Sequence, residues 1–197
     1  MDIVTIEEAC LKRKQSRHEA AVSCFSNKVV ALYKDKKERG IPNVKQQEFS
    51  SAGSGVLVSL SSRKFLVTAG HVLHSARNSP MWLLNNELFE SFGGIWRVTG
   101  KNGVAGDGPI DFGWIEIDEE LSKKINESRF VTEDQMTWSM SGSKDRGYTA
   151  IGYPHSKNKR FFKDIHVGTW TYTSEGTTSK DKGLDEFEDH LFVSYNP

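Results

Sequence analysis

Apolar side chains recur at roughly helical spacing from residue 5 to residue 39, and this periodicity predicts a single N-terminal helix. Two glutamates lie near the start of this segment, and several lysines and an arginine lie near its end. The helix dipole favours that distribution. Gly40 and Pro42 then interrupt the pattern, as such residues do where a helix ends. We therefore expect residues 1–42 to form an N-terminal helical extension.

After Pro42 the pattern changes to short apolar segments separated by clusters of Gly, Asn, Ser and Asp. Many short strands with turn signals between them favour an all-β barrel or sandwich. Residues 118–135 have the pattern of a short helix or loop that joins two β units. The predicted strands cover residues 53–60, 64–69, 81–84, 94–99, 111–117, 147–153, 160–172 and 188–195.

Composition and charge exclude several classes of protein. The 197 residues carry 26 Lys and Arg against 26 Asp and Glu, so we expect neither a nucleic acid nor an anionic membrane as a partner. No apolar run approaches the roughly 18 residues of a membrane span, and the N-terminus lacks the apolar core of a secretory signal. Cys10 and Cys24 do not make a disulfide framework. These features together predict a cytoplasmic protein.

The first candidate for chemistry is His71. Two apolar segments, 53–58 and 65–68, predict a pair of strands joined by a polar turn, and Ala69 and Gly70 follow the second strand. Small residues at a strand end let the backbone turn tightly and present the imidazole at the edge of a cleft. A general base that activates a hydroxyl group must be held rigidly at such an edge, and histidine is the residue type most often used for that role.

The string Gly-Ser-Gly-Val-Leu-Val, a turn, and then Leu-Val-Thr-Ala-Gly-His-Val-Leu resembles the trypsin-like serine peptidases, specifically their bacterial and intracellular branches. The resemblance implies a double β-barrel and a Ser-His-Asp catalytic triad in which His71 is the general base. The string from Tyr148 to Pro154 resembles the strand that opens the second barrel in this family. On this basis the first barrel would span 43–135 and the second would begin within 136–197.

Asp111 is the second candidate, since it opens the alternating segment 109–117. In the family a similar Asp-Ile-Ala string supplies the aspartate of the triad, although Phe and Gly follow the aspartate here. The resemblance implies that Asp111 accepts a hydrogen bond from the imidazole of His71 and fixes its tautomer. Asp107, in a glycine-rich stretch four residues earlier, is the competing candidate.

No serine after Gly152 lies in the Gly-x-Ser-Gly-Gly-like turn that the family uses for its nucleophile and oxyanion hole. Ser141 lies in a partly similar string, but it precedes the strand at Gly152, which is the wrong order for the fold. Ser54 lies inside the strand that leads to His71. We therefore expect no nucleophile within this chain, a second barrel that is incomplete, and a serine beyond residue 197 or on a second polypeptide.

The remaining motifs predict neither a metal nor a cofactor. His74 follows His71 by three residues, but no cysteine or well-placed carboxylate completes a metal site. The glycine-rich stretch from Gly100 to Gly108 lacks the Lys-Ser/Thr pair of a phosphate-binding loop.

The sequence thus favours a trypsin-like serine endopeptidase that hydrolyses peptide bonds in a protein or peptide, with this chain bearing His71 and Asp111. The alternative is a catalytically inactive protease-fold module that binds or regulates a partner. A third possibility is one half of a complementing pair, whose C-terminal fragment or second polypeptide supplies the serine. The N-terminal helix could also dock a protein partner.

Overall fold

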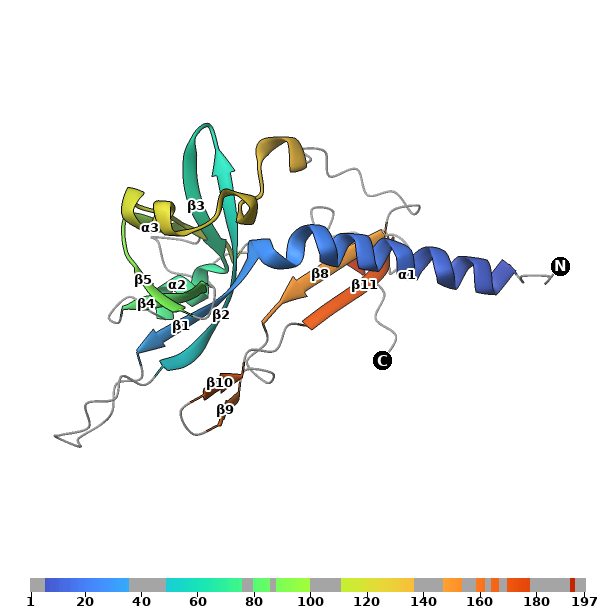
Figure 1. Ribbon diagram of the computed structural model, residues 1–197, viewed down its shortest axis with the longest axis horizontal. Coiled ribbons are helices and arrows are strands. Elements are labelled where there is room, and N and C mark those ends of the chain that lie inside the picture. The colour runs from blue at the N-terminus through green and yellow to red at the C-terminus, as the bar shows by residue number, and fades with distance from the viewer. Residues whose placement is uncertain are drawn as a thin grey trace. The chain divides into compact units, whose positions relative to one another are not determined.

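The structure is a computed structural model that describes the chain in ten ranges. It is mainly β with an N-terminal helix, as the sequence predicted (Figure 1). The chain divides into two compact units, one of residues 1–26, 137–151 and 171–197, and a larger one of residues 27–136 and 152–170. The predicted barrel limits at 43–135 and 136–197 stay predictions. The described ranges are 6–35, 49–75, 80–85, 88–99, 111–136, 147–153, 159–161, 164–166, 170–177 and 192–193.

A seven-stranded sheet dominates the larger unit, and its strands follow the order β5-β4-β1-β2-β3-β7-β6. Every neighbouring pair is antiparallel, and the sheet curls into a half barrel (Figure 1). The strands are β1 (Val29–Asp35), β2 (Phe49–Leu60), β3 (Arg63–Thr68), β4 (Met81–Asn85), β5 (Leu88–Phe92), β6 (Trp96–Val98) and β7 (Gly113–Glu116).

Short helices and a small hairpin complete the larger unit. Helix α2 (Gly70–Ser75) follows β3, and α3 (Glu119–Lys124) follows β7. Two 3₁₀ turns, η3 (Glu127–Arg129) and η4 (Glu133–Gln135), lie in the connecting segment predicted at 118–135. Strands β9 (Lys159–Phe161) and β10 (Asp164–His166) pair with each other.

The smaller unit contains helix α1 (Ile6–Phe25) and most of a three-stranded sheet in the order β12-β11-β8. Its strands are β8 (Gly147–Gly152), β11 (Trp170–Thr177) and β12 (Phe192–Val193). Among the described helices, none combines the length and the apolar character that crossing a membrane requires.

The prediction of one helix over residues 5–39 was wrong in its second half. Helix α1 ends at Phe25, and after a 3₁₀ turn, η1 (Ser26–Lys28), the chain enters β1. The five residues from Val29 to Tyr33 are all buried, because β1 pairs with β2 on one side and β4 on the other. A central strand buried on both faces has a continuous apolar run, which periodicity alone does not distinguish from a buried helix.

Buried leucines of β1, β2, β3 and β4 form the centre of the core. Leu32, Leu57, Leu66 and Leu83 are all 0% exposed. Gly55 in β2 lies among them, since a Cβ added there would be 2.6 Å from Cδ1 of Leu66 and 3.2 Å from Cδ1 of Leu32. Side chains from the two neighbouring strands, β1 and β3, therefore pack so closely over β2 that the position of Gly55 accepts only a hydrogen.

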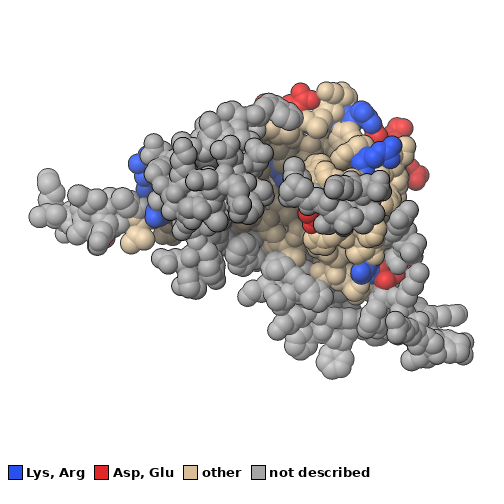
Figure 2. Space-filling model, turned by 180° about the vertical axis from the view of Figure 1, so that it is seen from behind, with Lys and Arg blue, Asp and Glu red and all other residues tan. Residues whose placement is uncertain are grey.

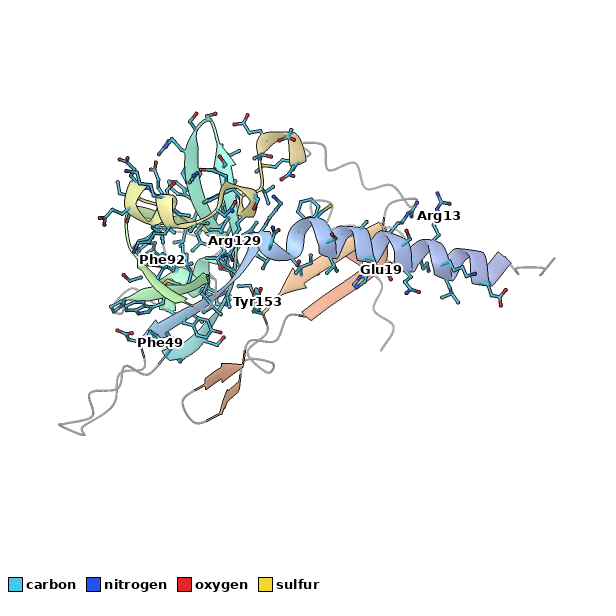
Figure 3. All side chains as sticks on the ribbon, in the orientation of Figure 1. Arg13, Glu19, Phe49, Phe92, Arg129 and Tyr153 are labelled. Carbon is cyan, nitrogen blue, oxygen red and sulfur yellow. The ribbon has the colours of Figure 1, made fainter. Side chains whose placement is uncertain are left out.

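Two cationic side chains, Lys28 and Arg129, form hydrogen bonds between the segment after α3 and the residues directly before β1. The buried ammonium group of Lys28 donates hydrogen bonds to the carbonyl oxygens of Ser128, at 3.0 Å, and Phe130, at 2.8 Å. Nε of Arg129, labelled in Figure 3, donates to the carbonyl oxygen of Asn27 at 2.9 Å. Burial lowers the pKa of Arg129 from its usual value. Backbone carbonyl groups thus replace the hydration that the buried ammonium group of Lys28 and the half-buried guanidinium group of Arg129 lose.

On the surface, basic and acidic side chains lie beside one another, as Figure 2 shows for one face. Arg63 pairs with Glu116 at 2.6 Å and Lys124 with Glu90 at 2.9 Å. Exposed ion pairs of this kind contribute little to the free energy of folding, so they do not account for the stability of the fold.

Candidate active site

Helix α2 presents His71 at the surface of the larger unit. Val72 and Leu73, the next two residues, are 4% and 3% exposed and anchor the helix in the core. Just before the helix, the hydroxyl of Thr68 donates to the carbonyl oxygen of Ser54 at 2.7 Å. The side chain of His71 itself is 66% exposed. The buried face of this short helix therefore holds the imidazole in a fixed place that solutes can reach.

Asp111 reaches this helix from a neighbouring part of the sheet, directly before β7. The backbone there is held by Thr99, which follows β6. The amide of Thr99 donates to the carbonyl oxygen of Phe112 at 2.7 Å, and the hydroxyl of Thr99 accepts from the amide of Phe112 at 2.9 Å. These two bonds fix the backbone of the residue that follows Asp111.

The structure brings His71 and Asp111 into direct contact, although 40 residues separate them in the sequence. Nδ1 of His71 is hydrogen-bonded to Oδ2 of Asp111. The backbone amide of His71 donates to Oδ1 at 2.9 Å, and the backbone of Gly70 adds a further hydrogen bond. One carboxylate therefore accepts from both the ring and the backbone of the same histidine.

These hydrogen bonds lower the pKa of Asp111 from its usual value, the bond from the His71 ring contributing most. An ionised carboxylate only accepts hydrogen bonds, so the proton between the two side chains lies on Nδ1 of His71. In the neutral form of the ring, the second nitrogen, Nε2, then keeps its lone pair. This arrangement can take up a proton from a neighbouring acidic group.

Ser54 is engaged elsewhere in the larger unit. Its hydroxyl oxygen accepts a hydrogen bond from the amide of Tyr153 at 2.7 Å, and its carbonyl accepts from Thr68. The backbone of Gly152 also lies close, since a Cβ there would be 3.3 Å from the Ser54 hydroxyl. The hydroxyl of Ser54 thus joins β2 to Gly152 and Tyr153 within the larger unit.

Within the part of the chain that the structure describes, the ring of His71 is hydrogen-bonded to Asp111 and to no hydroxyl group. Ser141 and Asp107, the other two candidates from the sequence, lie outside the described residues. The identity of a nucleophile therefore stays a prediction.

His74, on the same helix, is not part of this arrangement. Its Nδ1 is buried and has no hydrogen-bond partner among the described residues. Across the described ranges, no group of three or more His, Cys, Asp and Glu side chains is placed to hold a metal ion.

Sequence reasoning missed Thr99, which the strand pattern placed only at the end of the segment 94–99. A threonine at a strand end carries no local signal of a partner 13 residues away. The sequence alone shows that Gly113 departs from the family string. What this glycine does depends on the backbone that packs against it, which the sequence does not reveal.

A comparison with models of protein families finds no match, and a comparison with curated proteins finds none either. Among solved structures, the chain is similar to one described as the HtrA-type protease AlgW with a decapeptide. The two are 20% identical in sequence, and the TM-score is 0.49. The match covers 81% of this chain but only 45% of that one, so this chain spans less than half the length of the protease that it resembles.

Proposed function

We propose that this chain carries the general base and the orienting acid of a trypsin-like serine peptidase. The observation that supports the proposal is the double hydrogen bond of Asp111 to the ring and the backbone amide of His71. A surface ion pair of a flexible histidine would not need the backbone bond. The backbone bond ties the carboxylate to the start of α2 as well as to the ring, and a base that transfers protons must be held in one orientation.

In the proposed reaction, Nε2 of His71 takes the proton from a serine hydroxyl while the serine oxygen attacks the carbonyl carbon of a peptide bond. Asp111 holds the proton on Nδ1 and stabilises the imidazolium that forms. His71 then returns the proton to the nitrogen of the leaving amine as the C–N bond breaks, which leaves an acyl-enzyme. Water, deprotonated by the same nitrogen, hydrolyses the ester.

The serine of this scheme lies outside the described residues, on this polypeptide or on another one. The proposed substrate class is a protein or peptide, as the resemblance of the strings around His71 and Asp111 to the trypsin-like peptidases implies. The intracellular setting expected from the sequence is part of the same proposal.

The test is labelling of the purified protein, together with any fragment that copurifies, by a fluorophosphonate probe, followed by mapping of the labelled residue by mass spectrometry. We expect a label on one serine and its loss in His71→Ala. In Asp111→Asn the labelling rate should fall by about 10⁴. The asparagine amide can donate to Nδ1 and fix the wrong tautomer, while its carbonyl still accepts from the backbone.

Asp134→Asn is the matched control, since Asp134 is exposed and bonds to Thr132 in the turn η4. It should label like the unmodified chain. If Asp111→Asn is labelled as fast as the unmodified chain, His71 and Asp111 do not act together as a catalytic pair, which we call the dyad. If no serine is labelled in a folded preparation, the peptidase proposal fails, and the alternative of an inactive binding module is then favoured.

A further inference from the structure

Two glycines lie against each other where helix α2 meets strand β7. A Cβ added to Gly113 would be 2.9 Å from Cδ1 of Leu73 and 3.2 Å from both Cα of Gly70 and the carbonyl oxygen of Arg97. A Cβ added to Gly70 would be 3.0 Å from Oδ1 of Asp111 and 3.0 Å from the carbonyl oxygen of Phe112. Neither position has room for a methyl group unless its neighbours move.

Backbone conformation does not explain these glycines. Among the described residues, the glycines with positive φ are Gly53 and Gly94, so Gly70 and Gly113 adopt angles that other residues also adopt. What requires glycine at these two positions is the close approach of two backbones. The contact therefore sets the spacing between the start of α2 and the start of β7.

That spacing is the one on which the dyad depends. Gly70 directly precedes His71, and Gly113 follows Asp111 by two residues. The carboxylate of Asp111 spans the gap, with Oδ1 2.9 Å from the His71 amide and Oδ2 on the ring. Because Thr99 fixes the backbone of Phe112, Asp111 has little freedom to follow if α2 moves away.

We propose that the Gly70–Gly113 contact is a positioning device that keeps His71 within hydrogen-bonding reach of Asp111. Gly113 is then a positioning residue that acts through the dyad and does not touch a substrate. Its importance for turnover rests on the proposed function, but its effect on the dyad is a property of this chain alone.

The test compares Gly113→Ala with Gly93→Ala in the full chain. Gly93 is a matched control, because a Cβ there would have nothing within 4 Å. Long-range ¹H–¹⁵N correlation spectra at neutral pH report which ring nitrogen of His71 carries the proton, and His71→Ala assigns the signals. We expect protonation mainly at Nδ1 in the unmodified chain and in Gly93→Ala, and mainly at Nε2 in Gly113→Ala.

A second variant, with Leu73 replaced, keeps the test decisive if Gly113→Ala does not fold. Leu73→Val removes the side-chain atoms that the new methyl group would meet first, while the backbone of Gly70 stays opposite. The double variant should fold and still show the Nε2 tautomer, whereas Leu73→Val alone should keep Nδ1 protonated. A double variant or a folded Gly113→Ala that keeps the Nδ1 proton would refute the proposal.

The outcome is separable from that of the labelling experiment. If the chain takes no fluorophosphonate label but shows the expected tautomers, the peptidase proposal fails and the positioning role of Gly113 stands. If it is labelled, Gly113→Ala should slow labelling by about 100-fold, as small misplacements of catalytic groups do. An unmodified chain with His71 protonated at Nε2 would contradict the dyad and with it both proposals.

Discussion

Replacement of Leu32 by alanine tests the assignment of residues 29–35 to a central strand. Leu32 is 0% exposed and lies in β1 opposite Gly53 of β2 and Leu83 of β4. Truncation of a fully buried leucine costs about 2–5 kcal/mol, because the lost burial is joined by a cavity that neighbours fill only in part. We take about 3 kcal/mol for this site, which corresponds to a fall of about 6–12 °C in Tm for a chain of this size.

Leu11→Ala is the control. Leu11 lies in α1 and is 66% exposed, so its truncation should change the free energy of unfolding by no more than about 0.5 kcal/mol. Urea and thermal unfolding, followed by circular dichroism and tryptophan fluorescence, give both values. If Leu32→Ala is as mild as Leu11→Ala, residues 29–35 are not a central strand and the reasoning from the fold is refuted.

A double-mutant cycle with Gly55 makes the same test more specific. Gly55→Ala alone should destabilise by about 1–3 kcal/mol through overpacking, because its Cβ would meet Leu66 and Leu32. With Leu32 shortened, part of that space is free, and the two changes together should cost less than their sum. Simple additivity would mean that the two side chains do not meet.

Two further predictions concern the dyad and the hairpin turn. Hydrogen bonds from His71 lower the pKa of Asp111 below its ordinary value of 3.8, so the stability that its ionised form contributes is present above about pH 3.8 and is lost as the pH falls through the lower folded-state pKa. Tm measured from pH 2 to pH 7 should therefore show a gap between the unmodified chain and Asp111→Asn that closes at the acid end, and a gap that closes near pH 6 would contradict this. Ser61 and Ser62, between β2 and β3, have φ of 47° and 68°, and Ser62→Gly should raise stability by about 0.5–1 kcal/mol in urea unfolding, since glycine adopts this region without strain. An unchanged or lower midpoint would argue against strain at this turn.

The two residues of the candidate site could be predicted because the signals are local. His71 follows a strand and two small residues, and Asp111 opens an alternating segment, so each motif is complete within a few positions. The structure adds that the two motifs meet. That meeting was implied only by the family resemblance.

The parts that were missed depend on partners distant in the sequence. The run from Val29 to Tyr33 is apolar at every position, so whether it is helix or strand is decided by β2 and β4 on either side. Strand β5 (Leu88–Phe92) was not predicted at all, and its pairing with β4 depends on a neighbour more than on its own polar and apolar pattern. Likewise, the closeness of Gly70 and Gly113 is a property of two backbones, which no single stretch of sequence contains.

The position of β1 changes where the chain can safely be shortened. The sequence alone suggested that everything before residue 43 is an appendage, and a shortened protein would naturally begin there. Such a cut would delete the strand that joins β4 and β5 to the rest of the sheet, and it would expose the edge of β2 to pairing with other molecules. The latest sensible start for expressing the larger unit is therefore near Asn27, where that unit begins.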